Sequence, residues 1–129
     1  MANVQRVNIT VGPTTSGGAA TNYSEAIRGN ITRLRYTPDG TSPLDTGGDL
    51  TITDEDSGAS IIVITNIGTF AVEFAPRMPT HSTAGVASTY DGTRAVTDPR
   101  GIPVFGRVKV VTASGGTSVT GGEIQVWYE

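Results

Sequence analysis

Short segments in which apolar and polar residues alternate recur along the chain, and turns rich in glycine and proline separate them. An alternation with a period of two is typical of a β-strand that buries one face. The last segment carries Ile124, Val126 and Tyr128 on one face and Gln125 and Trp127 on the other. The pattern predicts seven strands, at residues 4–11, 23–37, 49–53, 60–65, 70–75, 104–112 and 123–129.

The second predicted strand, 23–37, changes its buried face part of the way along. Ile31 belongs to one parity and Leu34 to the other, which is the pattern that one extra residue in a strand produces. We therefore predict a β-bulge in this strand, with Gly29-Asn30 as one position for it.

Arg33 and Arg35 lie in the same strand, on the face opposite Leu34 and Tyr36. A solvated face is the simpler interpretation of such a pair. The alternative is a basic stripe that binds a partner, because the planar guanidinium forms paired hydrogen bonds and is weakly hydrated.

The fourth predicted strand, 60–65, is a continuous apolar run rather than an alternating one. Such a run is typical of a strand that is covered on both faces, or of a strand that faces another subunit. Residues 54–58 read Asp-Glu-Asp-Ser-Gly and favour a turn, so we predict a hairpin formed with strand 49–53.

The alternation disappears over residues 76–101. An irregular segment of this length is uncommon in a compact domain and is usually functional or disordered. Flexible linkers lack apolar anchors, but this segment contains Met78, Val86, Tyr90, Val96, Arg77, Arg94 and Arg100. We predict an ordered contact arm whose arginines bind carboxylate or carbonyl groups of a neighbour, with Met78 and Tyr90 as apolar anchors. The alternative is a loop that is merely solvated.

The composition supports an all-β fold. The chain has 129 residues, enough for one domain, and contains 13 Val, 10 Ile and 20 Thr but only 3 Leu. Side chains branched at Cβ favour strands over helices. We predict an all-β, single-domain (1–129) antiparallel β-sandwich or small barrel of about seven strands, with one long irregular loop at 76–101.

Charge and cysteine content exclude several classes of protein. The net charge of −3 gives no support to nucleic-acid binding, and no apolar run approaches the ~20 residues of a membrane span. The absence of cysteine rules out disulfides, thiolate catalysis and zinc–cysteine sites. Residues 1–11 lack the apolar segment of a signal peptide, so we expect synthesis in the cytoplasm without export.

The residues that could carry chemistry form no recognisable catalytic motif. Asp54, Glu55 and Asp56 could offer oxygen ligands to calcium, but they lack the spacing of a calcium-binding loop, so a solvated turn is the simpler interpretation. His81 has only hydroxyl side chains beside it in the sequence. We therefore predict no enzyme activity, no metal and no cofactor.

Trp127 and Tyr128 are adjacent in the last predicted strand, so they lie on opposite faces. An exposed tryptophan on a β-sandwich can stack on a sugar ring, which would suit a carbohydrate-binding module. It can equally anchor a subunit interface, where Trp, Tyr and Arg are enriched. The chain has 1 Trp, 4 Tyr and 3 Phe, which leaves few aromatic rings for a sugar-binding row once the core is filled.

Four motifs follow a polar start rich in threonine and glycine: ITRLRY (31–36), DTGGDLTIT (45–53), FAPRMPTHSTAGVAS (74–88) and RVKVVTASGGTSVTGGEIQVWYE (107–129). Their order resembles a group of small proteins that tailed bacteriophages encode near the major capsid protein. The group carries no catalytic motif that could be transferred to this chain.

The resemblance implies a head decoration or cement protein, which is a small β-domain that binds the capsid exterior as a dimer or trimer. Such a protein staples neighbouring major capsid subunits through many weak contacts that act together. The alternatives are a carbohydrate-binding β-sandwich of a virion and another head or tail component, such as a head-to-tail joining protein. The candidate partner-binding residues are Arg33, Arg35, Arg77, Met78, Tyr90, Arg94 and Arg100.

Overall fold

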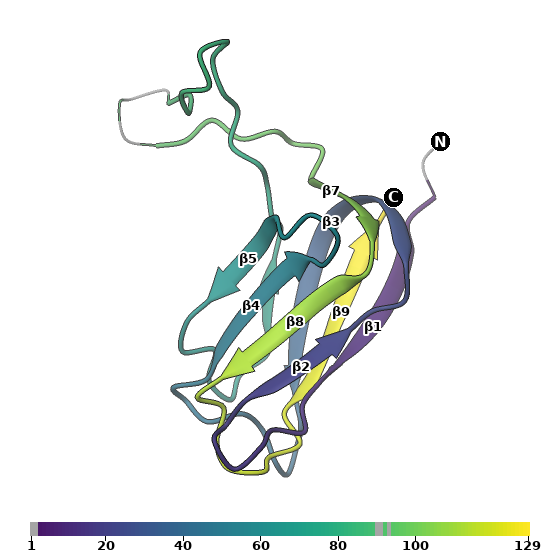
Figure 1. The fold of residues 1–129 in the computed structure, drawn as a ribbon, viewed down its shortest axis with the longest axis vertical. Coiled ribbons are helices and arrows are strands. Elements are labelled where there is room, and N and C mark those ends of the chain that lie inside the picture. Colours follow the sequence, from purple (N-terminus) through teal and green to yellow (C-terminus); the bar gives the residue numbers. More distant parts are fainter. Residues whose placement is uncertain (1–2, 90–91, 93) are drawn as a thin grey trace.

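The computed structural model describes residues 3–89, 92 and 94–129, and over these residues the chain forms two antiparallel β-sheets packed as a sandwich (Figure 1). Sheet A has the strand order β1-β9-β3-β6, with β7 also paired to β3, and sheet B has the order β2-β8-β4-β5. The strands are β1 (Gln5–Val11), β2 (Ala20–Tyr23), β3 (Ile27–Pro38), β4 (Asp49–Asp54), β5 (Ser60–Ile64), β6 (Val72–Phe74), β7 (Ile102–Gly106), β8 (Val108–Ala113) and β9 (Gly122–Tyr128). The predicted all-β sandwich is confirmed, and the sheets do not close into a barrel.

The described residues form nine strands where the alternation predicted about seven, because two predicted strands are each divided between the sheets. Of the predicted strand 23–37, only Tyr23 belongs to β2 in sheet B, and residues 27–37 belong to β3 in sheet A; the other residues of β2, 20–22, lie outside every predicted strand. The predicted strand 104–112 breaks at Arg107, between β7 in sheet A and β8 in sheet B. Val104 and Val108 are both buried in the one core that the two sheets share. The alternation therefore continues across the break and hides it.

The predicted bulge in β3 is present, but its position differs from Gly29-Asn30. The register between β3 and β9 shifts between Ile31 and Arg33, where the buried parity changes. Ile31 and Leu34 are both fully buried on either side of this shift. The extra residue thus lets one strand keep both of its apolar halves in the core.

The predicted hairpin between 49–53 and 60–65 is confirmed by the antiparallel pairing of β4 with β5. β5 is the edge strand of sheet B, and Val63 on its outer side is 58% exposed. The interpretation that this strand is covered on both faces is therefore wrong within a single chain.

The predicted strand 70–75 is shorter in the structure than the alternation suggested. β6 contains only Val72–Phe74, and Phe70, which we expected on the same face as Val72 and Phe74, lies in the preceding loop with 79% of its surface exposed. Since β6 pairs with β3 at the edge of sheet A, only the residues opposite β3 are held in strand geometry.

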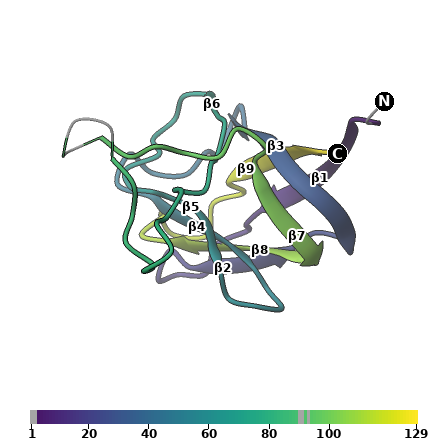
Figure 2. The same cartoon turned by 90° about the horizontal axis from the view of Figure 1, so that it is seen from above.

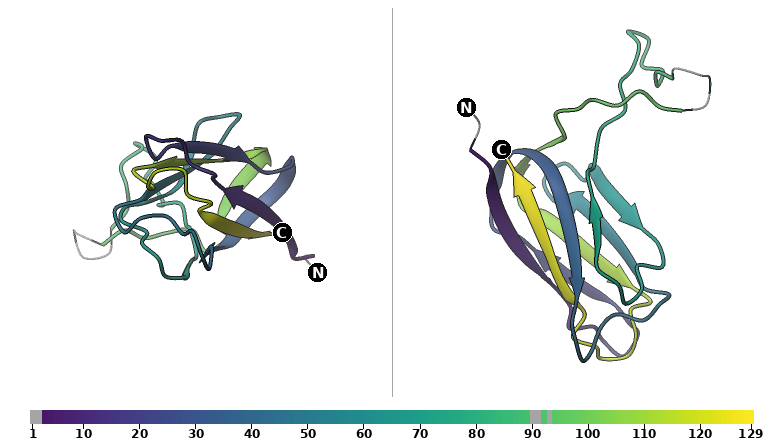
Figure 3. Two further views of the ribbon diagram at one scale, coloured as in Figure 1. Left: turned by 90° about the horizontal axis from the view of Figure 1, so that it is seen from below. Right: turned by 180° about the vertical axis from the view of Figure 1, so that it is seen from behind.

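Residues 76–101 leave the sandwich between β6 and β7 and project from one end of it (Figures 1 and 3). The same end carries the C-terminus and the described start of the chain. We call the projecting segment 76–101 the arm.

Candidate functional site

Both ends of the arm are fixed to strand β3. The guanidinium of Arg77 donates hydrogen bonds from Nη1 to the carbonyl oxygens of Pro76 at 2.8 Å and Thr32 at 3.3 Å. At the other end, Gly101 has a φ of 90° and lies so close to the carbonyl of Ile31 that a Cβ atom would collide with it. Neighbouring positions of β3 therefore hold the two ends of the arm side by side.

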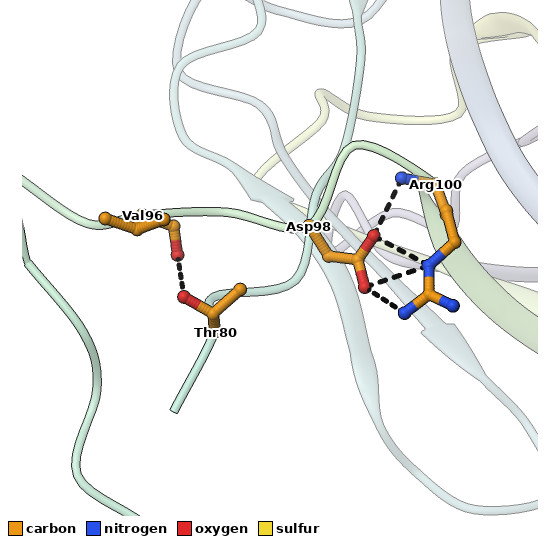
Figure 4. Close-up of polar contacts among 4 residues, drawn as sticks. All are labelled: Thr80, Val96, Asp98 and Arg100. Atoms are coloured by element: carbon orange, nitrogen blue, oxygen red, sulfur yellow. Dashed lines mark hydrogen bonds and ion pairs between the residues drawn. The ribbon is translucent and has the colours of Figure 1, made fainter. Parts of the chain in front are cut away.

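A second set of contacts lies near the base of the arm, where Asp98 binds both Arg100 of its own segment (Figure 4) and the backbone of the opposite segment. The Asp98 carboxylate accepts hydrogen bonds from Nη2 of Arg100 at 2.6 Å and from Nε at 3.0 Å. The backbone N–H of Asp98 donates to the carbonyl of Met78 at 2.8 Å. The Arg100 side chain, followed by its backbone N–H, lowers the pKa of Asp98 from 3.8 to about 2. The carboxylate therefore stays charged, and its bond to Arg100 stays available, at any pH above about 4.

Beyond its base, the arm is organised by a ring of backbone hydrogen bonds among three of its segments. The Thr80 N–H donates to the carbonyl of Val96 at 2.8 Å. The Val96 N–H donates to the carbonyl of Ser88 at 3.0 Å, and the Ser88 N–H donates to the carbonyl of Thr80 at 2.8 Å. The Thr80 hydroxyl donates a further bond to Val96, at 2.8 Å (Figure 4). The arm is therefore ordered in the described residues, although each paired stretch is too short to show an alternating pattern.

The arm exposes its apolar side chains instead of burying them in the sandwich. Val86 is 65% exposed, and Met78 and Val96 are also exposed. Figures 1 and 3 show the outer part of the arm standing clear of both sheets. We predicted that this segment packs against something, and the sandwich of its own chain is not that surface.

A hollow of about 320 Å³ lies where the arm meets sheet A, lined by Asn30, Met78, Asp98, Arg100, Gly101 and Pro103. The thioether of Met78 makes one side of it apolar, and the Asp98–Arg100 ion pair makes another side polar. A flexible thioether adapts to many apolar shapes. The hollow therefore suits a small apolar side chain that is flanked by a polar group.

The structure brings together some of the predicted partner-binding residues and separates others. Arg77, Met78 and Arg100 converge at the base of the arm, whereas Arg94 lies farther out, next to Ala95 in the outer bridge to Thr89. Tyr90, the predicted apolar anchor, lies outside the described residues.

Arg33 and Arg35 form an ion-paired row rather than a free basic stripe. Both point toward Glu73 of β6, whose Oε1 lies 2.7 Å from Nη2 of Arg33 and 3.7 Å from Nε of Arg35. The Arg33 guanidinium also lies 4.5 Å from the centre of the Trp127 ring. Since one carboxylate partly neutralises both cations, the stripe attracts an acidic partner less than two free arginines would.

Three aromatic rings at the surface of the strands each have an arginine stacked on them. Besides Trp127, Phe105 lies under Arg28 at 4.6 Å and Tyr23 lies under Arg107 at 4.2 Å. Phe105 is 64% exposed and was not among the predicted site residues, although its place after the buried Val104 indicated an outward side chain. Tyr23 belongs to sheet B and the other two rings to sheet A, so the three do not line up as a sugar-binding row would.

The acidic turn 54–56 is bound to its own chain. Glu55 accepts two hydrogen bonds of 2.6 Å from Arg107, which lower the pKa of the Glu55 carboxyl. The Asp54 side chain is mostly buried and accepts the N–H of Asp56. Across the described residues, no three acidic, histidine or cysteine side chains gather in a way that could hold a metal ion.

No known protein family matches the sequence, and no curated protein matches it either. None of the chain that the structure describes forms a helix long and apolar enough to span a membrane.

Proposed function

We propose that this protein is a structural component of a tailed-bacteriophage virion, a decoration or cement protein. In this proposal it binds the outer surface of the capsid and connects neighbouring major capsid subunits, and the arm makes the main contact. One observation carries the proposal: an ordered arm, fixed at its base, presents exposed apolar side chains that its own sandwich leaves uncovered. Such an element suits attachment to another protein better than catalysis.

The physical form of the arm favours binding. Fully burying a valine or methionine side chain contributes about 1.5–3 kcal/mol, and Met78, Val86 and Val96 are exposed for such burial. Ordering a flexible loop on binding usually costs free energy and weakens the complex. The backbone bonds that link Thr80, Ser88 and Val96 have already ordered this one.

The choice of a capsid as the partner depends on the resemblance in sequence. One of the four motifs, residues 74–88, covers the end of β6 and the first half of the arm. One of the four motifs that resemble the phage proteins therefore includes the first half of the arm. On a capsid, many copies act together, so that a weak contact per copy gives firm attachment.

Binding to purified capsids that lack the protein tests this proposal. We expect Val86→Lys and Val96→Lys to weaken co-sedimentation with capsids at least tenfold, because each places a charge at the apolar contact. Phe105→Ser is the matched control, since Phe105 is equally exposed but lies on the sandwich. Unchanged binding by both arm variants, or equal loss in the control, would contradict the proposed role of the arm.

Limited digestion with trypsin gives an independent test. Cleavage after Arg94, in the outer part of the arm, should be faster in the free protein than cleavage after Arg100, which Asp98 holds at the anchored base. Cleavage after Arg94 should become slow once capsids are bound, because the docked arm is covered. Equal cleavage rates in the two states would show that the arm is not at the interface.

A further inference from the structure

The sandwich is closed along one side and open along the other. On the closed side β1 lies against β2. On the other side the sheets end in β5 and β6, which both lie on the side toward which the arm leans (Figures 2 and 3). Four inward-facing residues of these two strands remain only partly buried against the core: Ile62, Ile64, Val72 and Phe74. We call this open side the β5–β6 flank.

A long stretch of sequence in and around β5 has no charged side chain. No charged residue occurs between Asp56 and Glu73, a stretch that contains all of β5 and the loop leading to β6. This stretch also includes two of the most exposed apolar side chains, Val63 and Phe70. Along β5 and the loop that follows it, a second copy of this protein, whose net charge is −3, therefore meets no charge of its own sign.

β5 also differs from the other strands at the edges of the sheets. Natural edge strands are protected from pairing with another chain by charge, proline or shortness. β1 carries Arg6, β6 has Glu73 at its centre, β7 contains Pro103, and β2 has four residues. β5 has five residues, Ser-Ile-Ile-Val-Ile, with neither charge nor proline. Its pairing with β4 shifts register opposite Ile52/Thr53, but residues 62–64 pair regularly. The outer backbone groups of β5 are thus available to a further strand.

We propose that the β5–β6 flank binds a second copy of this chain, with β5 of one copy paired antiparallel to β5 of the other. The two four-stranded sheets B then form one continuous sheet. The antiparallel arrangement places the acidic turn 54–56 of each copy next to the uncharged residues 65–69 of its partner. A parallel arrangement would bring the two acidic turns together.

Pairing in this way also covers the side chains that a single chain leaves exposed. Ile62 and Ile64, at the edge of the core, gain a neighbouring strand, and Val63 gains a cross-strand partner of the β-branched type that stabilises sheets. The interface does not depend on the proposed function. Combined with that function, antiparallel pairing gives a dimer with one arm at each of its two opposite ends.

Sedimentation velocity of the full chain, without capsids, tests the dimer. At about 100 µM, well above the micromolar dissociation constants of modest interfaces, we expect the wild-type protein to be a dimer. Val63→Lys should be a monomer with an unchanged circular dichroism spectrum, because residue 63 is exposed in the single chain and an edge lysine blocks strand pairing. Val86→Lys is the matched control on the arm and should remain a dimer.

Cross-linking provides a readout that does not depend on how Val63→Lys folds. The natural chain has no cysteine, so Val63→Cys introduces a single thiol, and a short bis-maleimide should link two copies through it. Val86→Cys should not be linked. A monomeric wild-type protein, a dimeric Val63→Lys variant, or linkage through residue 86 instead of 63 would overturn the proposal, whatever the result with capsids.

Discussion

Replacing Gly101 by alanine tests how rigidly the arm is joined to the sandwich. The φ of 90° at this position is one that L residues adopt at a loss of about 1–2 kcal/mol. The new Cβ also collides with the carbonyl of Ile31, and β3 cannot easily move because it pairs with β7 and β9. Adding a methyl group in such a packed place costs about 1–3 kcal/mol more. We therefore expect the free energy of unfolding to fall by about 2–5 kcal/mol.

Thermal and urea denaturation measure this loss, and Gly85→Ala is the matched control. Gly85 also has a positive φ, of 78°, but nothing lies within contact distance of its added Cβ, and it belongs to the outer arm. For a domain of this size, 1 kcal/mol corresponds to roughly 3–6 °C in Tm. Gly101→Ala should melt on the order of 10 °C lower than wild type, and Gly85→Ala only slightly lower. A loss below about 1 kcal/mol for Gly101→Ala, or equal losses for both variants, would refute the anchoring argument.

Three further outcomes follow from the structure. Leu34→Ala, at a fully buried position, should lower the free energy of unfolding by about 2–5 kcal/mol, whereas Val63→Thr in the monomer should stay within about 0.5 kcal/mol in urea denaturation. In an NMR titration the Asp98 carboxyl should titrate near 2 rather than 3.8; because its pKa is lowered in the folded state, its contribution to stability is present above about pH 4 and is lost as the pH falls toward 2. Arg33→Ala should red-shift the fluorescence of Trp127, the single tryptophan, because the stacked guanidinium no longer shields the ring, and an unchanged spectrum would contradict the stacking.

The alternation of side chains could predict the strands because one face of each sheet is buried in a single core. Ile124 and Val126 of the last strand are buried as their spacing required. The same property explains the error in strand number. A chain that crosses from one sheet to the other between Val104 and Val108 keeps its apolar side chains directed at the same core, so no local signal marks the crossing.

Pairing between distant residues was beyond what local patterns could predict. Arg33 and Arg35 were correctly placed on an outer face, but Glu73, which neutralises them, lies about forty positions away in the sequence. In the arm, length and composition indicated a functional segment. The ring that joins Thr80 to Val96 involves single bridges, which leave no periodic trace in the sequence.

The most direct test of the proposed function is to remove the arm without disturbing the sandwich. Pro79 and Thr97 already face each other as antiparallel bridge partners, so residues 80–96 can be replaced by a two-residue Asn-Gly turn. The armless and wild-type proteins are then compared by co-sedimentation with capsids purified without the protein, and by their circular dichroism spectra. We expect the wild-type protein to sediment with the capsids, and the armless protein to keep its β-sheet spectrum and stay in the supernatant. An armless protein that sediments as well as wild type would contradict the proposed function.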